Sequence, residues 1–233
     1  RAVDFQCTRR SSSPVRYSRG MTSSSPAEAT ARARASPSPD QSPPSGMPGS
    51  GTVDGTTACY PVSQNQHVHG VLDVSYAPAD LPGSGQADAA ELCTYIAEEL
   101  QFVGVMAVEM FVVGRDVLVN ELAPRPHNSG HYTLDACLTS QFEQQVRAIC
   151  GLALGDTKLV VPGVAMVNLL GQLWADGEPR WQNVLGNSAA HLHLYGKSEP
   201  RAGRKMGHLT VTTGTAMGAT SLARRLRKQL GAG

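Results

Sequence analysis

The feature that most constrains the fold of this chain is a pair of apolar, β-branched stretches joined by a short turn. Residues 105–113 and 117–122 flank Gly114-Arg115-Asp116, and a turn of this composition is typical of a β-hairpin. With the middle residue of the turn at the apex, Glu109 and Glu121 face each other on one side of the hairpin, their Cβ atoms about 5 Å apart. Two like charges in such a pair destabilise a sheet unless a positive charge lies between them.

Two interpretations of this glutamate pair are open. On a solvated face, both side chains would be surface charges without a role. By strand alternation, however, the pair shares its face with five apolar side chains, Ala107, Phe111, Val113, Val117 and Val119. An apolar face seldom points into water, and a carboxylate among apolar groups needs a partner. The pattern therefore favours a divalent cation with oxygen ligands, most naturally Mg²⁺ carrying the phosphates of a nucleotide.

A polar loop follows the hairpin directly. The segment 123–131 contains Arg125, His127, Asn128 and His131, and its prolines and glycine prevent the strand from continuing. An arginine fork suits carboxylate, carbonate or phosphate, and a histidine can exchange a proton near neutral pH. The spacing of the two histidines would also suit a zinc pair on a helix, but the prolines disfavour a helix here. We therefore expect this loop to carry reactive groups beside the metal.

Two specific motifs connect the chain with a known family. They are APRPHNSGH (123–131) and GRKMGH (203–208), and the stretches 57–79 and 191–212 match together with them. Over residues 52–215 the chain closely resembles 5-(carboxyamino)imidazole ribonucleotide synthase, the ATP-dependent half of phosphoribosylaminoimidazole carboxylase in purine biosynthesis. The sequence is most similar to the fungal and plant versions. The resemblance implies membership of the ATP-grasp superfamily.

The resemblance also implies an α+β fold in two parts. Residues 52–155 correspond to the C-terminal part of an ATP-grasp domain, and residues 156–233 to a small β-rich C-terminal domain that ends in a helix. The apolar periodicity predicts the individual elements. Strands are expected at 57–62, 69–77, 163–170, 191–195 and 208–212, and helices at 87–100, 140–150 and 217–230.

The first 51 residues differ in composition from the rest. Residues 1–51 are rich in Ser, Pro, Arg and Ala, poor in acids and without periodicity, so we expect them to be disordered. One interpretation is an organellar transit peptide, which would place the protein in a plastid rather than in the cytoplasm. We favour the other, a truncated or misread gene product, because the family has its first domain and its ATP-covering lid at this place.

The composition limits the remaining function classes. The 233 residues carry a formal net charge of +1, which offers no electrostatic basis for binding nucleic acid or a membrane surface. No apolar run approaches the ~20 residues of a membrane span. The five cysteines form no C-x-x-C pair and are typical of reduced thiols in an intracellular protein.

The resemblance assigns a nucleotide and metal site to this chain. Its cofactors would be ATP and Mg²⁺, with the metal held by Glu109 and Glu121. Asn120, Glu121 and His67 would contact the nucleotide. Judged by the sequence alone, His67 is equally a histidine in an exposed loop.

The resemblance also implies a reaction and a substrate site. ATP would phosphorylate bicarbonate to carboxyphosphate, and the amine of 5-aminoimidazole ribonucleotide would attack the CO₂ that this species releases. Arg125, His127 and Asn128 would be the catalytic groups. Lys197 and Arg204 would grip the 5′-phosphate of the ribonucleotide; without the resemblance they belong to a solvated basic loop.

The family also suggests partners and one alternative. Members are commonly homodimers, and a mutase domain is normally fused or partnered. The alternative is a non-catalytic remnant or binding module, because no Gly-rich phosphate-covering loop precedes residue 52. The segment 181–191 is also shorter than in the family.

Overall fold

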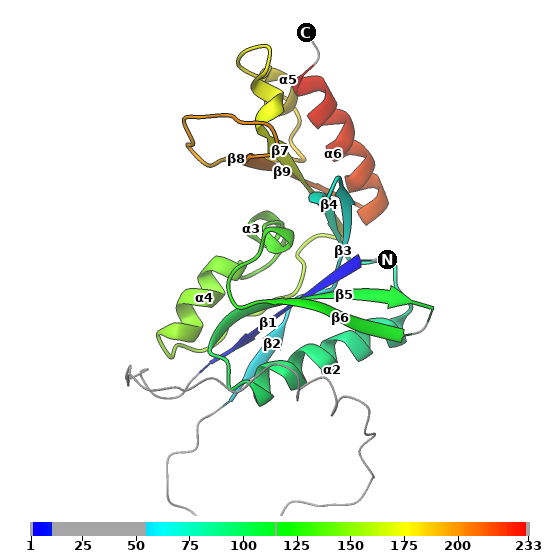
Figure 1. The fold of residues 1–233 in the computed structure, drawn as a ribbon, viewed down its shortest axis with the longest axis vertical. Helices are drawn as coiled ribbons and strands as arrows, with labels where there is room; N and C mark the ends of the chain where they lie inside the picture. Colours follow the sequence, from blue (N-terminus) through cyan, green and yellow to red (C-terminus); the bar gives the residue numbers. More distant parts are fainter. Residues whose placement is uncertain (1, 11–54, 115, 232–233) are drawn as a thin grey trace, which may run out of the picture.

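The computed structural model describes residues 2–10, 55–114 and 116–231, which form one antiparallel sheet with helices packed against it (Figure 1). The strands of this part of the chain are β1 (Ala2–Arg9), β2 (Thr57–Cys59), β3 (Ser63–Val68), β4 (Val71–Ala77), β5 (Gly104–Val113), β6 (Asp116–Ala123), β7 (Gly163–Leu170), β8 (Ala190–Leu194) and β9 (Lys205–Thr213). The helices are α2 (Gly83–Glu99), α3 (Thr133–Ala136), α4 (Gln141–Ile149), α5 (Gln182–Leu185) and α6 (Ala216–Leu230), with 3-10 turns η1 (Asn128–Gly130) and η2 (Gly171–Trp174). The strand order is β6-β5-β1-β3-β4-β7-β9-β8, with β2 paired to β1. This mixture of helix and strand confirms the expected α+β class.

The first strand, β1, lies inside the sheet between β5 and β3. The prediction that residues 1–51 are disordered is therefore wrong for residues 2–9, and residues 11–54 lie outside the described residues. The strand forms because apolar and polar side chains alternate along it with the period of a β-strand. Val3, Phe5 and Cys7 point into the apolar cluster between the sheet and α2, while Asp4, Gln6 and Thr8 are buried on the opposite face.

The β5–β6 hairpin places Glu109 directly opposite Glu121, as predicted. The predicted turn, however, is wrong in length: Val113 pairs with Asp116, so two residues rather than three form the loop. If the pairing from this turn continued without a break, Asn120 would lie opposite Glu109. A β-bulge at Glu109/Met110 shifts the pairing by one residue, so that Asn120 is the extra residue and Glu121 faces Glu109.

The bulge also changes which apolar residues share the glutamate face. Leu118 lies opposite Phe111 on this face, and both side chains are about half exposed (52% and 44%). Val117 packs with the cluster on the α2 side instead, and Val119 lies opposite the buried Met110. The prediction that Val117 and Val119 flank the glutamates is therefore wrong.

Two apolar cores hold the sheet at its two ends. Below β1, β5 and β6, helix α2 contributes Ala89, Cys93 and Ala97, whose small side chains let the helix pack closely. At the other end, α6 packs against β4, β7 and β9 through Ala219, Ala223, Leu226 and Leu230. Strands β3 and β4 connect the two ends (Figure 1). Strand β4 precedes the predicted domain boundary at residues 155/156 and β7 follows it, and the two strands pair within one sheet. The domain boundary stays a prediction.

Helix α4 packs its polar side inward. It begins at the Ser140 cap, whose hydroxyl accepts a hydrogen bond from the Glu143 N–H. Gln141 and Gln144 are fully buried, whereas Phe142, Val146 and Ile149, the residues that mark this helix in the sequence, are 38%, 53% and 48% exposed. The inward glutamines bond to the backbone of neighbouring loops, so this helix anchors loops through hydrogen bonds.

Most other predicted elements are confirmed with small changes at their ends. Strand β7 has the predicted bounds, and α6, β8 and β9 start or end a few residues from theirs. Strands were expected at 57–62 and 69–77 with a loop between them; the chain instead forms β2, β3 and β4. His67 therefore lies at the end of β3, beside a bulge, and not in a loop.

Candidate active site

A cleft of about 810 Å³ opens between the β5–β6 hairpin, the end of β3 and the β8–β9 connection. Six of the nine predicted site residues line it: His67, Glu109, Asn120, Glu121, His127 and Lys197. The other lining residues include two that were not predicted, Asp4 and Lys205. The cleft therefore joins groups that lie far apart in the sequence.

Acidic groups gather on one wall of this cleft. Asp4 on β1 lies directly opposite Glu109 on β5, which in turn faces Glu121 on β6. Asp4 is only 2% exposed, and its Oδ2 accepts no hydrogen bond among the described residues. Burial and the neighbouring Asp4 raise the pKa of Glu109 above its ordinary value. A cation in this position would relieve the repulsion.

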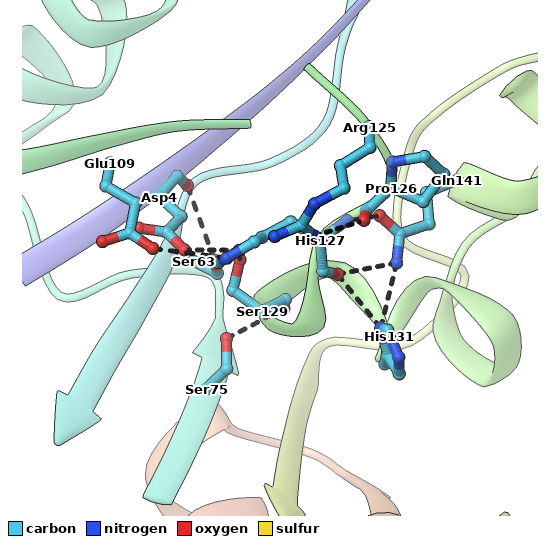
Figure 2. Close-up of polar contacts among 10 residues, drawn as sticks. All are labelled: Asp4, Ser63, Ser75, Glu109, Arg125, Pro126, His127, Ser129, His131 and Gln141. Carbon is cyan, nitrogen blue, oxygen red and sulfur yellow. Dashed lines mark hydrogen bonds and ion pairs between the residues drawn. The ribbon is translucent and has the colours of Figure 1, made fainter. Parts of the chain in front are cut away.

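The imidazole of His127 lies against the acidic wall (Figure 2). Its Nε2 is 3.3 Å from Glu109 Oε1, and its Nδ1 is 3.4 Å from Asp4 Oδ2. The same Nδ1 lies 2.9 Å from Ser129 Oγ, within hydrogen-bond distance. The ring is thus held at both nitrogens, with one edge toward a carboxylate of the cleft.

The loop that carries His127 is fixed by buried hydrogen bonds. Gln141 of α4 accepts from the His127 N–H at 2.9 Å and donates to the His127 carbonyl at 2.8 Å. Ser75 of β4 donates to the Ser129 carbonyl at 3.0 Å. Gly130 lies so close to β1 that a Cβ there would overlap the Gln6 side-chain amide, so a larger residue would displace either this amide or the loop. These contacts hold the histidine in place without a ligand.

Two lysines form the basic wall of the cleft. The Lys197 ammonium donates to the Lys205 carbonyl at 2.6 Å and lies 5.3 Å from the centre of the Tyr195 ring. Burial and the nearby Arg125 lower the pKa of Lys205. Two neighbouring ammonium groups, of which Lys205 is partly buried and Lys197 exposed, are suited to binding an anion.

Three predicted residues do not line the cleft. Arg204 donates to the Glu199 carbonyl at 2.9 Å, whereas Lys205, the next residue, lines the cleft. Arg125 lies on the same loop as His127 and donates to the Pro126 carbonyl at 3.1 Å (Figure 2). The Nδ2 of Asn128 is buried and has no hydrogen-bond partner among the described residues.

His131 does not join His127 in a metal pair. Its Nδ1 lies 3.0 Å from the His127 carbonyl, and its ring packs edge-on against His208 and Phe142. Burial lowers its pKa to about 4, so this ring stays neutral. The zinc alternative therefore has no support from the geometry.

Asp4 and Lys205 are the residues that sequence reasoning missed. Apolar and polar residues alternate from Val3 to Thr8, which is typical of a strand, but the Ser- and Pro-rich residues that follow obscured this signal. Lys205 lies next to Arg204 in the GRKMGH motif. A basic residue at that spacing was expected, but sequence alone does not show which of two adjacent cations points into a cleft.

The acidic wall is suited to a hard divalent cation. The carboxylates of Glu109 and Glu121 and the side-chain oxygen of Asn120 are the ligand types that Mg²⁺ prefers. The buried Asp4 oxygen without a hydrogen bond and the raised pKa of Glu109 are what a desolvated acidic site shows without a cation. The residues present therefore fit the metal.

Comparison with known proteins identifies the family of this chain. Residues 50–142 match the family model of the ATP-grasp domain, and residues 164–221 match that of the phosphoribosylaminoimidazole carboxylase C-terminal domain. The chain is 49% identical over 162 residues to N5-carboxyaminoimidazole ribonucleotide synthase of Bacillus subtilis (strain 168), an alignment covering 68% of this chain and 41% of that protein. It belongs to the family of the N5-carboxyaminoimidazole ribonucleotide synthases.

Solved structures of N5-carboxyaminoimidazole ribonucleotide synthases have a similar fold. The synthetase of Thermus thermophilus superposes with a TM-score of 0.73 at 33% identity, covering 100% of this chain and 51% of that chain. The Aspergillus clavatus synthase, solved with ADP and 5-aminoimidazole ribonucleotide, gives a TM-score of 0.67 at 30% identity, covering 75% and 47%. The chain thus spans about half the length of these relatives or less.

Within the described residues, the helices are too short or too polar to cross a membrane.

Proposed function

We propose that these residues carry the metal-binding and substrate-binding half of an ATP-dependent synthase that carboxylates 5-aminoimidazole ribonucleotide through carboxyphosphate. The observation that carries the proposal is the single cleft with an acidic wall, a fixed histidine and a basic wall. These three features match the three demands of the reaction: a metal–nucleotide, a proton-handling centre and a substrate phosphate. The relatives' names supply the substrate class.

At the acidic wall, Glu109 and Glu121 would hold Mg²⁺, with Asn120 beside them and His67 toward the nucleotide. Bound there, Mg²⁺ neutralises phosphate oxygens during phosphoryl transfer. Asp4 lies next to Glu109 and adds negative charge behind the pair. Its role would be to strengthen the attraction for the cation.

At the centre, His127 orients the ribonucleotide amine and takes up its proton at Nε2. That nitrogen lies 3.3 Å from Glu109 Oε1, whose negative charge stabilises the imidazolium that results. Arg125, on the same loop, would bind bicarbonate with its planar fork. The Nδ2 of Asn128 is buried, without a partner among the described residues, and would reach the same group if the side chain turned toward the cleft.

At the basic wall, Lys197 and Lys205 would bind the 5′-phosphate of the ribonucleotide. Lys197 is pre-positioned by its bond to the Lys205 carbonyl and by the Tyr195 ring. Arg204 does not line the cleft, and its Nη1 donates to the Glu199 carbonyl. The proposal keeps Arg204 as a secondary contact.

The test is phosphate release by the complete protein that contains these residues. We expect release from ATP to require both bicarbonate and 5-aminoimidazole ribonucleotide, and His127→Ala to lower the turnover by about two orders of magnitude. ATP hydrolysis that does not respond to the ribonucleotide would contradict the proposed substrate. A matched control is His69→Ala, because His69 is exposed and does not line the cleft.

A further inference from the structure

Three cysteine side chains gather beneath the sheet, on the side away from the cleft. Cys7 of β1 and Cys59 of β2 are direct cross-strand partners, and their Sγ atoms lie 2.8 Å apart. Cys93 of α2 is fully buried and packs in the same apolar cluster. Cys137 and Cys150 lie elsewhere, the latter exposed at the end of α4.

The backbone around the first two cysteines already suits a disulfide. Residues directly opposite each other in an antiparallel pair have Cα atoms about 4.5–5.5 Å apart. A disulfide needs a Cα separation of about 4.4–6.8 Å and side chains on the same face, which this register supplies. A bond between the sulfurs therefore requires only a small movement of the side chains.

The environment also distinguishes Cys59 as the reactive thiol. Cys7 is 1% exposed and Cys93 is fully buried, whereas Cys59 is partly exposed. The hydrogen bond from the Cys7 thiol lowers the pKa of Cys59, and Thr94 Oγ1 lies 3.4 Å from the same sulfur. A thiolate with access to solvent is the species that reacts with oxidants.

We propose that Cys7 and Cys59 form a reversible disulfide when a peroxide oxidises the protein, and that Cys93 is the neighbouring thiol that can take part in thiol–disulfide exchange with them. The Cys59 thiolate attacks one peroxide oxygen, the O–O bond breaks and hydroxide leaves, so Cys59 becomes a sulfenic acid. The Cys7 sulfur then attacks the Cys59 sulfur, the S–O bond breaks, and the departing hydroxide takes the Cys7 proton as water. In sum, two thiols are oxidised by two electrons and one hydrogen peroxide is reduced to two water molecules.

This bond would have a defined structural effect. It would join residues 52 apart in the sequence and fasten the end of β1 to β2. The same strand carries Asp4, three residues before Cys7, into the cleft. Oxidation would therefore fix the strand that supplies the acidic wall. The inference does not depend on the proposed function.

The experiment treats the native chain with hydrogen peroxide, alkylates the remaining thiols and maps the peptides by mass spectrometry. We expect two of the five thiols to become unreactive and a cross-linked peptide pair to contain Cys7 and Cys59. Dithiothreitol should restore both thiols. Oxidation confined to Cys150, or five thiols that all remain alkylatable, would overturn the proposal.

Variants sharpen the test. Cys59→Ser should abolish the cross-link, whereas Cys150→Ser should leave it unchanged. In Cys7→Ser we expect Cys59 to pair with Cys93 instead, because Cys93 belongs to the same apolar cluster. A Cys59 that stays a free thiol in that variant would overturn the role of Cys93. Peptide mapping of the unmodified chain decides the main claim even if a variant fails to fold.

Discussion

Glu121 on β6 faces Glu109 on β5 because β6 has one extra residue, Asn120, at the β-bulge next to this pair. Without the bulge, the two-residue loop would place the amide of Asn120 opposite Glu109. The bulge therefore brings two like charges together in a cleft, at a cost in stability that a bound cation can offset.

The first prediction concerns this pair. Glu109→Gln and Glu121→Gln should each reduce ATP turnover of the complete protein by about a hundredfold or more, since each removes a charge from the metal site. Circular dichroism should show an unchanged fold. Glu91→Gln on the exposed side of α2 is the matched control and should turn over normally. Wild-type turnover in both cleft variants would rule out a metal site here.

The second prediction concerns stability without metal. Because burial and Asp4 raise the pKa of Glu109, its ionisation in the folded chain is penalised. The penalty is absent below the ordinary pKa near 4.5 and grows as the pH rises through the folded-state pKa. Glu109→Gln should thus be more stable than the parent chain near neutral pH by a few tenths of a kcal/mol, as measured by urea unfolding. Added Mg²⁺ should reverse the order; a variant less stable at neutral pH without metal would be contrary to this account.

The third prediction concerns an ion pair between β8 and α3. His193 Nε2 donates to a carboxylate oxygen of Asp135 at 2.9 Å, and this hydrogen bond raises the pKa of His193 above 6.5. Stability from this pair is therefore fully present below pH 6.5 and is lost as the pH rises through the folded-state pKa. Between about pH 6 and about pH 8, urea unfolding should show falling stability in the parent chain and a flatter profile in Asp135→Asn. Parallel profiles would show that the pair contributes nothing.

The fourth prediction separates two adjacent cations. Lys197→Ala and Lys205→Ala should each weaken binding of 5-aminoimidazole ribonucleotide by about tenfold or more, because each removes a charge-assisted hydrogen bond. Arg204→Ala should have the smaller effect, since its guanidinium lies outside the cleft. Lys158→Ala is the control, because Lys158 is exposed and does not line the cleft. Titration calorimetry gives all four affinities; a larger loss in Arg204→Ala than in Lys205→Ala would return the role to Arg204.

The fifth prediction concerns the inward side of α4. Gln141 is fully buried and bonds both the N–H and the carbonyl of His127. Gln141→Leu should destabilise the chain by about 1–3 kcal/mol, because it leaves the His127 N–H without its acceptor, whereas the carbonyl keeps the Gly130 N–H. Gln229→Leu, at an exposed position of α6, should change the stability little. Equal unfolding midpoints for the two variants would contradict the anchoring role.

The sequence predicted the parts of this molecule that a local pattern encodes. The β5–β6 hairpin, the carboxylate pair and the polar loop after it follow from alternation, turn residues and motif spacing. The pairing of Glu109 with Glu121 was predicted correctly but from the wrong turn. The loop is one residue shorter than expected, and the bulge adds one residue to β6, so the two differences cancel. A bulge is decided by packing on both faces of a sheet, and single-sequence alternation does not contain that information.

Other features depended on contacts between distant segments. The eight residues of β1 alternate clearly, but their low-complexity neighbours gave the whole segment the character of disorder. The inward glutamines of α4 contradict the usual apolar inner face, because the partners that make them stable are loop backbones elsewhere in the chain. The choice of Lys205 over Arg204 likewise depends on which side of β9 faces the cleft.

The most direct test of the central claim is a crystal structure of the complete protein with Mg²⁺, ADP and 5-aminoimidazole ribonucleotide. We predict a metal ion within about 2.0–2.1 Å of a carboxylate oxygen of Glu109 and of Glu121. The ribonucleotide should lie across the cleft, with its phosphate at Lys197 and Lys205 and its amine beside His127. A ribonucleotide phosphate at Glu109 and Glu121, or a metal bound away from both glutamates, would contradict the account.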